Sequence, residues 1–368
     1  MTRRVLLLIK GLGRGGAEQI LASAAPHLDR TRFDYEVAYL LPWKDALVKD
    51  LEDADVPAHC LDGSRGVAWV SRLRRLVLER RFDLIHAHSP VAASAARVAL
   101  AVGGPPIVYT EHNVWERYHR ATYWSNMLTF ARNSHVFAVS DHVRDSIRYP
   151  QTLARLRMPP VETLYHGIDQ ASIGGWIRRN GVREELGIGA DAPVVGTVAN
   201  FKGHKRLDQL LRAARLVRRE VPGVRFVLVG QGPLEMQLRS LTHQLGLDDT
   251  VVFTGFREDA QRVCSTFDVF ALSSEHEGLS IALIEALALG KPAVVTDVGG
   301  LTEVIEHERQ GYIVPVDEPA TLADRLVQLL RDPELRSKMG QEGRFRAETF
   351  DIRRSVRRME RVYEELLS

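Results

Sequence analysis

The sequence has almost no cysteine and no long hydrophobic run. Its two cysteines, Cys60 and Cys264, stand about 200 positions apart with no metal-ligand spacing around either, which fits a reduced, cytoplasmic compartment. The first apolar run, residues 5–9, leads directly into a glycine-rich segment, so it is too short for a signal peptide and has no small-residue cleavage site. No apolar run approaches the ~20 residues that span a bilayer. We therefore expect a cytoplasmic chain whose first apolar run is a buried strand.

Charge of one sign is also lacking. The 49 Lys and Arg residues nearly balance the 47 Asp and Glu residues, and a net charge of +2 is too small to indicate a nucleic-acid-binding protein. The balance is uneven along the chain, because residues 1–168 hold 22 basic and 17 acidic residues and the remainder hold 27 and 30. The first half is therefore better suited to an anionic partner or surface.

What the sequence does contain is a repeated alternation of short apolar runs and helical stretches, over 368 residues, which is long enough for two domains. The strands predicted in the first half are residues 5–9, 35–41, 83–88, 107–111 and 135–139. Those predicted in the second half are residues 194–198, 225–229, 251–253, 269–272 and 293–296. Repeated strand–helix units with apolar strands imply parallel sheets covered on both faces. The pattern predicts an α/β protein with two similar domains, 1–168 and 169–351, followed by an amphipathic helix at 352–367.

The segment from Glu277 to Glu285 follows the predicted strand 269–272. Ligands of open parallel sheets bind at the carboxyl ends of the strands, so two such domains facing each other would bind a ligand in the cleft between them. We expect a helix to begin near Leu279, where free backbone N–H groups would bind a phosphate and Gly278 would permit close approach. The two carboxylates, roughly 8–9 Å apart along the helix, would suit hydroxyls on both ends of a diphosphate-linked sugar. In the alternative interpretation Glu277 caps the helix and Glu285 is a solvated helix residue.

Two lysines follow another predicted strand. Lys202 and Lys205 come after residues 194–198 and before a helix that is expected to begin at Leu207. Two cations at a strand end would neutralise the charge on a leaving diphosphate without a metal ion. The alternative is a solvated cationic turn.

Residues 11–16 between the first strand and the first helix match the pattern G-x-G-x-x-G. That pattern alone is weak evidence for a dinucleotide site. The second strand should then end in an acid that binds the ribose, but Asp45 comes too late, which disfavours an NAD-dependent oxidoreductase. We interpret Gly15 and Gly16 as a close backbone approach to a ligand, completed by Glu18.

Histidines also follow predicted strands. His112 comes after residues 107–109 and could donate a hydrogen bond or shuttle a proton near neutral pH, with Glu111 and Asn113 on either side. His86 and His88 end another strand and would line the side that binds an acceptor. In the alternative interpretation these histidines are structural.

Two further segments call for an interpretation. Asp53 and Asp55 form a D-x-D pair, but they close a polar helix and do not end an apolar strand, so we do not expect them to hold a metal ion. Residues 65–81 carry six arginines and one acid with apolar residues at helical spacing, and residues 118–132 are rich in aromatic residues. These two segments could rest on an anionic membrane surface, or their apolar stripes could pack on the sheet while the arginines are solvated.

Together these segments resemble family 4 of the GT-B glycosyltransferases, a group of retaining, metal-independent enzymes with two Rossmann-like domains that face each other across a cleft. The resemblance covers nearly the whole chain. It rests on the loop with Gly15, Gly16 and Glu18, on His112, on the interdomain element from His166 to Asp169, on Lys202 and Lys205, on the E-x7-E motif from Glu277 to Glu285, and on the Gly-Gly loop at 298–303. Two positions depart from the family pattern. Lys202 stands where arginine is usual, which loses bidentate phosphate contact, and His166 stands where asparagine is commoner.

The resemblance also implies roles for these residues. The two catalytic candidates are Glu277 and His112, on opposite sides of the transferred sugar. The donor-binding candidates are Gly15, Gly16, Lys202, Lys205, Gly278, Leu279, Ser280 and Glu285, of which Glu285 would bind the ribose. The candidates on the acceptor side are His86, His88, Glu111 and Asn113. The helix 352–367 would pack back on the first domain, and no metal ion or other cofactor is expected.

The sequence thus predicts an enzyme that moves a sugar, with retention, from a nucleotide sugar to a glycan or lipid-linked saccharide. Uridine is the commonest base among such families, and a role in cell-envelope polysaccharide synthesis at the inner face of the plasma membrane fits the basic first domain. Two alternatives remain. A nucleotide-sugar epimerase would share the fold and need no acceptor, and a non-catalytic protein would bind the nucleotide or the glycan alone.

Overall fold

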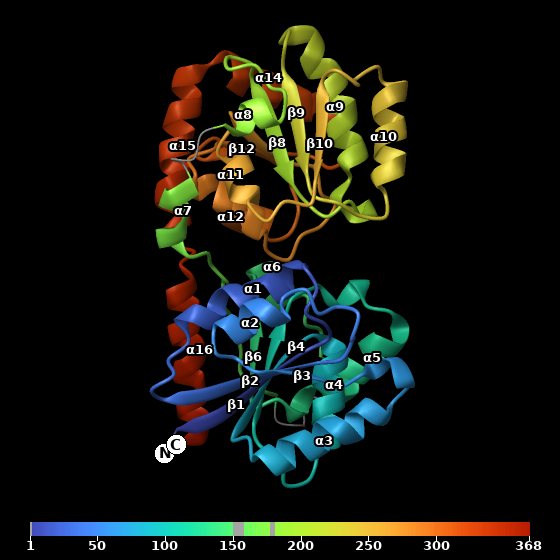
Figure 1. Ribbon diagram of the computed structural model, residues 1–368, viewed down its shortest axis with the longest axis vertical. Helices are drawn as coiled ribbons and strands as arrows, with labels where there is room; N and C mark the ends of the chain where they lie inside the picture. The colour runs from blue at the N-terminus through green and yellow to red at the C-terminus, as the bar shows by residue number, and fades with distance from the viewer. Residues whose placement is uncertain (1, 150–157, 177–180) are drawn as a thin grey trace. The chain divides into compact units, whose positions relative to one another are not determined.

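The computed structural model describes residues 2–149, 158–176 and 181–368, which form two compact units (Figure 1). Unit 1 comprises Met1–Gly167 together with Ile352–Ser368, and unit 2 comprises Ile168–Asp351. Each unit contains one parallel sheet with helices on both faces. The predicted α/β class with two Rossmann-like sheets is therefore confirmed.

The sheet of unit 1 has the strand order β3-β2-β1-β4-β5-β6-β7. The strands are β1 (Arg3–Ile9), β2 (Phe33–Tyr39), β3 (Ala58–Cys60), β4 (Leu84–His88), β5 (Ile107–Glu111), β6 (His135–Ala138) and β7 (Val161–Thr163). The strand order reverses at β1 and β4, where Ile9 lies beside His88. A reversal of this kind opens a crevice at the carboxyl ends of the strands, and ligands of doubly wound sheets bind there.

One predicted strand of unit 1 is shifted by two residues. The strand expected at residues 35–41 begins at Phe33 and ends at Tyr39. The chain leaves the sheet there because the backbone N–H groups of Leu40 and Leu41 both donate to the carbonyl of Lys10. The apolar character of these two leucines had extended the prediction beyond the true end of the strand.

The helices of unit 1 cover both faces of this sheet. They are α1 (Gly16–Ala24), α2 (Val48–Asp53), α3 (Ala68–Arg80), α4 (Pro90–Ala99), α5 (Arg120–Thr129), α6 (Asp141–Asp145) and α16 (Ile352–Leu367). Alternate residues of a strand face opposite sides, so Leu7 of β1 joins a core with α1, α2 and α16, whereas Leu6 and Leu8 join a core with α3, α4 and α5.

The carboxyl-terminal helix α16 is part of the core of unit 1. Its Glu360 is 1% exposed and accepts hydrogen bonds from the backbone N–H of Asp29 (2.8 Å) and from the Tyr35 hydroxyl (2.9 Å). Tyr363, one turn further on, is fully buried and hydrogen-bonded to His86. The last residues of the chain therefore complete a domain that begins more than 300 residues earlier.

The sheet of unit 2 has the order β10-β9-β8-β11-β12-β13 and reverses at β8 and β11. Its strands are β8 (Val194–Val198), β9 (Arg225–Val229), β10 (Val251–Gly255), β11 (Val269–Leu272), β12 (Ala293–Thr296) and β13 (Gly311–Val314). Its helices are α7 (Gln170–Trp176), α8 (Val182–Glu185), α9 (Leu207–Glu220), α10 (Glu235–Gln244), α11 (Ala260–Cys264), α12 (Ile281–Ala288), α13 (Leu301–Val304), α14 (Pro319–Arg331) and α15 (Pro333–Ala347).

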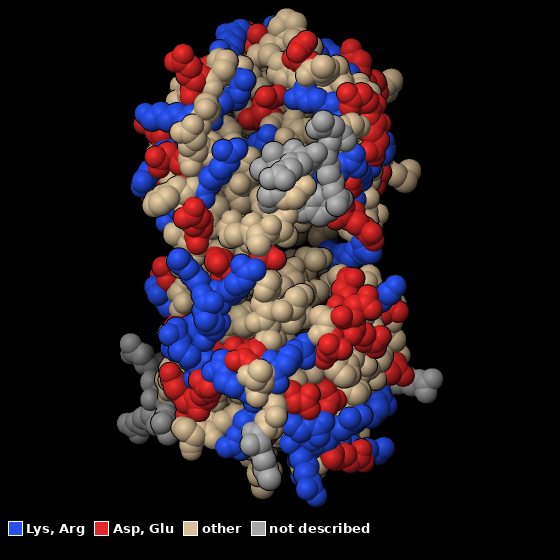
Figure 2. Space-filling model, turned by 60° about the vertical axis from the view of Figure 1, so that its left-hand side comes forward, with Lys and Arg blue, Asp and Glu red and all other residues tan. Residues whose placement is uncertain are grey.

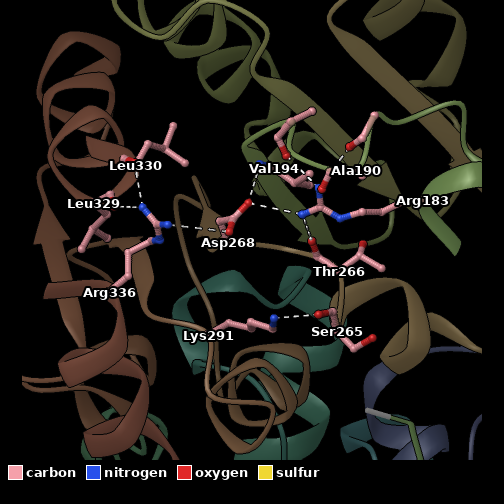
Figure 3. Close-up of polar contacts among 12 residues, drawn as sticks. Arg183, Ala190, Val194, Ser265, Thr266, Asp268, Lys291, Leu329, Leu330 and Arg336 are labelled. Atoms are coloured by element: carbon pink, nitrogen blue, oxygen red, sulfur yellow. Dashed lines mark hydrogen bonds and ion pairs between the residues drawn. The ribbon is translucent and has the colours of Figure 1, made fainter. Parts of the chain in front are cut away.

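Asp268 ties together the amino ends of the two central strands of unit 2 (Figure 3). Its Oδ2 accepts from the backbone N–H of Val194 (2.8 Å) at the start of β8 and lies 3.5 Å from Nη2 of Arg183. Arg183 also donates to the carbonyl of Thr266 (3.0 Å), and Nη2 of Arg336 lies 4.0 Å from the other carboxylate oxygen. This polar brace fixes the edge of the sheet opposite to the carboxyl ends, which leaves the loops at the carboxyl ends available for ligands.

Candidate functional site

Three loops converge at the carboxyl ends of the strands in unit 2. They follow β8, β11 and β12, and the loop after β11 leads into α12. This helix begins at Ile281, not near Leu279 as predicted, because the Ser280 side chain accepts a hydrogen bond from the backbone N–H of Leu283 (3.3 Å) and caps the helix. A helix start with free N–H groups still lies at this edge of the sheet.

Glu277 pairs with a lysine from the neighbouring loop. Its Oε1 lies 2.5 Å from Nζ of Lys205 and accepts a hydrogen bond from the Ser274 hydroxyl (2.8 Å). The alternative in which Glu277 caps the helix is therefore wrong, because Ser280 is the cap. Lys202 is exposed and, within the described part of the chain, forms no ion pair. The positive charge of Lys205 is thus paired with the carboxylate of Glu277, whereas that of Lys202 is not paired with any described residue.

Backbone contacts hold the loops after β8 and β11 together. The Ser273 hydroxyl bonds to the carbonyls of Lys205 (3.0 Å) and Arg206 (2.8 Å). The backbone N–H of Glu275 donates to the carbonyl of His204 (2.9 Å). These contacts join the two loops beside Lys205 and Glu277, which argues against a freely solvated turn at Lys205, whereas Lys202 is exposed.

The loop after β12 packs directly on the E-x7-E segment. The backbone N–H of Gly300 donates to the carbonyl of Glu277 (3.1 Å). A Cβ atom at position 300 would lie 2.0 Å from the carbonyl oxygen of Gly278, so only glycine fits there. The Gly-Gly loop at 298–303 therefore sets the path of the backbone beside Glu277.

Glu285 lies on α12 and is half-buried. Its Oε1 accepts a hydrogen bond from the side-chain amide of Gln261 on α11 (2.8 Å). Burial raises the pKa of Glu285 to about 7, and the Gln261 hydrogen bond opposes the rise. Glu285 is therefore not a fully solvated helix residue. The sequence prediction missed Gln261, because this residue lies on a five-residue helix with no recognisable motif.

In unit 1, His112 follows β5 and stands beside two other histidines. Its Nε2 is 3.4 Å from Nδ1 of His88, and its ring stacks on that of His166 with centroids 5.8 Å apart. Burial lowers the pKa values of His112 and His88 well below the usual range, and burial lowers that of His166 to about 4. All three imidazoles are therefore neutral at neutral pH. The contact with His166 was not foreseen from the sequence.

Three of the four residues predicted for the acceptor side, His86, His88 and Glu111, are buried, and two of them are fully internal. His86 is fully buried, and both ring nitrogens are hydrogen-bonded, to the hydroxyls of Thr110 (2.7 Å) and Tyr363. Glu111 is also fully buried and accepts from Tyr109, Trp115 and Tyr118 and from the backbone N–H groups of His112 and Asn113. Direct contact with an acceptor does not fit either residue. Each instead supports the loop that carries His112, whereas the Asn113 side chain is exposed.

Gly15 and Gly16 precede and begin α1. A Cβ at position 15 would lie 2.3 Å from Oε2 of Glu18, whereas a Cβ at position 16 would meet nothing within 4 Å. A side chain at position 15 would force the flexible Glu18 side chain to move, and Gly16 is not sterically constrained by the described residues.

Comparisons with known proteins agree with this arrangement. Residues 14–172 match the family model described as Glycosyltransferase Family 4, and residues 179–346 match that described as Glycosyl transferases group 1. The chain is 30% identical to the D-inositol 3-phosphate glycosyltransferase of Saccharomonospora viridis over 308 residues, which cover 78% of this chain and 71% of that protein.

The chain belongs to glycosyltransferase family 4. It is also 29% identical to the GDP-mannose-dependent alpha-(1-6)-phosphatidylinositol monomannoside mannosyltransferase of Mycobacterium tuberculosis over 93% of this chain and 92% of that protein. Among solved structures, Anabaena HepE in complex with UDP and glucose matches with a TM-score of 0.85 and 22% identity, over 99% of this chain and 100% of that chain. The protein is accordingly a glycosyltransferase with the GT-B fold.

The glycosyltransferase does not expose the apolar stripes for which membrane contact and packing on the sheet were both open. Trp69, Leu73 and Val77 of α3 are buried in the core of unit 1, as are Met127 and Phe130. Of the two interpretations, packing on the sheet therefore holds for these residues. Helical periodicity identifies an apolar face but does not say what covers it. In the described ranges, no helix combines the length and apolar character needed to cross a bilayer.

Asp53 and Asp55 lie at the end of α2 and just beyond it, and both are exposed. The chain runs from there into the start of β3 at Ala58, so both residues lie toward the amino end of that strand and not at the carboxyl edge that carries His112. Among the residues that the structure describes, no group of three or more His, Cys, Asp or Glu side chains is arranged to hold a metal ion.

Proposed function

We propose that this glycosyltransferase transfers a sugar from a UDP-sugar to a glycan or lipid-linked saccharide of the cell envelope, with retention and without a metal ion. The observation that carries the proposal is the cluster in unit 2 of Lys202, Lys205, Glu277 and the capped start of α12, with Glu285 eight positions beyond Glu277. Lysines beside a helix start suit a diphosphate, and carboxylates on both sides suit sugar and ribose hydroxyls.

The diphosphate would be bound by the two lysines and the helix start. Lys202 provides an unbalanced positive charge, and Lys205 is held in place by its 2.5 Å contact with Glu277. A bound diphosphate would share Lys205 with Glu277, so the cation is already positioned when the leaving group gains charge. Fixed cations and N–H groups of this kind stabilise the transition state without a metal ion.

The two carboxylates would bind the ends of the donor. Glu285, on the second turn of α12, would accept hydrogen bonds from the ribose hydroxyls, with Gln261 holding its other side. Glu277 would accept from a hydroxyl of the transferred sugar. UDP is proposed as the nucleotide because the structural relative HepE was solved with UDP and with UDP-glucose.

Unit 1 would bind the acceptor at the carboxyl edge of its sheet. His112 would face the transferred sugar as a neutral hydrogen-bonding group, and the exposed Asn113 would lie on the acceptor side. With no carboxylate assigned as general base, the leaving phosphate itself would take the proton of the acceptor hydroxyl. The new bond would then form on the face that the leaving group departs from, which gives retention.

The test is incubation of the purified protein with radiolabelled UDP-, GDP- and ADP-sugars, with and without a lipid-linked saccharide acceptor. Recovery of the label on the acceptor supports transfer. Conversion of the sugar without acceptor would instead identify an epimerase, and binding without either reaction would identify a non-catalytic protein. Activity that is abolished by EDTA and restored by a divalent metal would contradict the metal-independent mechanism.

The site assignment is tested by Lys205→Ala and Glu285→Ala, with the exposed Lys338→Ala on α15 as a matched control. We expect the first two variants to lose transfer by about 100-fold or more, as for other groups that stabilise developing charge. Both variants should still unfold cooperatively, so that the loss of transfer is not a loss of the fold. Near-normal transfer by both site variants would refute the assignment.

Peripheral binding to an anionic membrane is also part of the proposal. After the core residues of α3 and α5 are set aside, the outer surface of these helices still has Leu78 (53% exposed), Trp124 (52%) and Leu128 (65%). Amphipathic surfaces with arginine and apolar residues bind anionic lipid. Co-sedimentation with phosphatidylglycerol vesicles, lost in Trp124→Ala with Leu128→Ala, would support it. Equal sedimentation with phosphatidylcholine vesicles would contradict an anionic preference.

A further inference from the structure

A row of histidines runs through unit 1 from α16 to His112. His86, bonded to Tyr363 of α16, lies against His88 with ring centroids 4.2 Å apart and the ring planes tilted by 32°. Nδ1 of His88 faces Nε2 of His112 at 3.4 Å, and the ring of His112 lies parallel to that of His166, within 10°. His88 is thus the only one of these rings that is hydrogen-bonded to His112 in the described part of the chain.

A small cavity lies behind His88. It has a volume of about 20 Å³ and is enclosed mainly by apolar side chains of β1, α1 and α16, such as Leu7, Leu21 and Val356. Three polar residues also line it, namely His88, His166 and Ser355, and each is at most 5% exposed. The space is sufficient for one water molecule, which needs roughly 10–15 Å³ and two to four polar partners.

The polar atoms at this cavity lack partners within the protein. Nε2 of His88 and Nε2 of His166 are buried and form no hydrogen bond to any described residue. The Ser355 hydroxyl donates to the carbonyl of Ile352 (2.9 Å), so its oxygen remains able to accept. Buried polar atoms of this kind are costly unless a partner is supplied.

We propose that one buried water molecule binds His88, His166 and Ser355 in this cavity, and that His88, supported by it, fixes which ring nitrogen of His112 carries the proton. His88 is then a positioning residue that acts through His112. Its effect on catalysis rests on the proposed function, whereas the water site and the protonation of His112 do not.

The physical reason is that only one proton fits between Nδ1 of His88 and Nε2 of His112. Burial disfavours the charged form of either ring, so both imidazoles are neutral and each has one N–H. If His88 donates, the N–H of His112 is on Nδ1; if His88 accepts, Nδ1 of His112 is bare. Nδ1 of His112 forms no hydrogen bond to any described residue, so His88 decides whether it donates to or accepts from a substrate hydroxyl.

The test compares His88→Phe with His135→Phe in the full-length protein labelled with ¹⁵N-histidine. Phenylalanine keeps a ring against His86, and His135 is a buried histidine outside the row. We expect the ¹⁵N shifts of His112 to report one tautomer in the unchanged protein and in His135→Phe, and a mixture of both in His88→Phe. The same tautomer in all three proteins would overturn the positioning role.

Crystals of the unchanged protein test the water site directly. Electron density for a water molecule within hydrogen-bond distance of both Nε2 atoms supports it, and a cavity without density at high resolution refutes it. If the proposed function holds, His88→Phe should also lower kcat by about 10- to 100-fold while the KM for the donor stays within about twofold. Loss of the single tautomer without loss of kcat would leave the positioning intact and count against the role of His112 in transfer.

Discussion

Glu285 has an environment that opposes its charge. Burial raises its pKa to about 7, well above the ordinary range of a glutamate, and the hydrogen bond from Gln261 offsets only part of this rise. At neutral pH the side chain is therefore close to half ionised, although the proposed contact with ribose hydroxyls uses the carboxylate. As a result, the stability of the folded protein and its affinity for the donor should change in opposite directions as the pH rises.

Stability should fall as pH rises. A carboxyl whose pKa is higher in the folded state than in the unfolded state contributes its stabilisation below about pH 4.5 and loses it as the pH rises through about 7. The difference in unfolding free energy between Glu285→Gln and the unchanged protein should increase in favour of the variant by about 1–3 kcal/mol from pH 5 to pH 8. Urea denaturation of both proteins at the two pH values measures this, and parallel pH profiles would contradict it.

Donor binding should improve as pH rises. If the ionised form of Glu285 binds the ribose, affinity for a UDP-sugar should increase about tenfold between pH 6 and pH 8, following the ionised fraction of a group with pKa near 7. The diphosphate of a nucleotide sugar does not itself titrate in this range. Isothermal titration calorimetry should show the increase in the unchanged protein and a flat profile in Glu285→Gln. The same increase in both would assign it to another group.

At the scale of elements, the site in unit 2 depends on how closely three loops pack. The carbonyl of Glu277 is held by the backbone of Gly300, and that glycine leaves no room for a side chain against Gly278. The position of Glu277 beside Lys205 is thus set by backbone contacts as well as by charge.

Gly300→Ala should disturb this packing. A methyl group 2.0 Å from the Gly278 carbonyl forces the loop to move, and overpacking of this kind costs about 1–3 kcal/mol. We expect a lower unfolding temperature and a weaker affinity for the donor. Gly189→Ala is the control, because its Cβ would meet only an ordinary contact at 4.0 Å. Equal behaviour of the two variants would show that the loop is loosely packed.

The helix α16 depends on a buried acid for its attachment to unit 1. Replacing Glu360 with alanine leaves the Asp29 N–H and the Tyr35 hydroxyl without a partner. Each unsatisfied group costs about 1–3 kcal/mol, so Glu360→Ala should lose at least about 2 kcal/mol in unfolding free energy. The neighbouring exposed Arg361→Ala should change it by no more than about 0.5 kcal/mol. Chemical denaturation compares them, and a neutral Glu360→Ala would mean that water replaces the lost acceptor.

At the scale of the whole molecule, the two units differ in how the chain builds them. Unit 2 is one continuous segment with its own core, whereas unit 1 needs residues from both ends of the chain. Figure 2 shows basic and acidic side chains interspersed over both units on the face drawn, so neither unit presents a surface of a single charge there.

A fragment of residues 168–351 should therefore fold alone, while residues 1–167 should not. The second fragment lacks α16, whose Val356 and Tyr363 are buried in its core. We expect the first fragment to show a cooperative thermal transition and to bind a UDP-sugar, because the proposed contacts to the diphosphate and the ribose, from Lys202 to Glu285, lie within it. It should not transfer sugar. A folded fragment that fails to bind the donor would mean that unit 1 contributes essential contacts.

Much of the architecture followed from local patterns. The predicted strands 194–198, 225–229, 269–272 and 293–296 coincide with β8, β9, β11 and β12. These runs are mostly apolar because both faces of a parallel sheet are covered, and that signal is strong. The family was also confirmed. It could be recognised from the sequence because its motifs are short segments that keep their spacing along the chain.

The errors and the alternative that the sequence left open for α3 have a common cause. The shifted end of β2, the start of α12 at Ile281 and the stripe of α3 all depend on a contact that residue type does not reveal. The sequence does not distinguish a leucine just past a strand from one inside it, or a serine that caps a helix from one that does not. It also does not distinguish an apolar face that packs on a sheet from one that is exposed.

By itself the sequence determined the two α/β domains, the family and the residues that stand at strand ends, because each depends on periodicity or on spacing over a few residues. Only the tertiary structure decided which of those residues meet: Lys205 with Glu277, Gln261 with Glu285, and His88 with His112. It also decided that His86 and Glu111 are internal. These pairings join residues from different strands or helices, and their distances are set by the packing of whole layers, which no local pattern encodes.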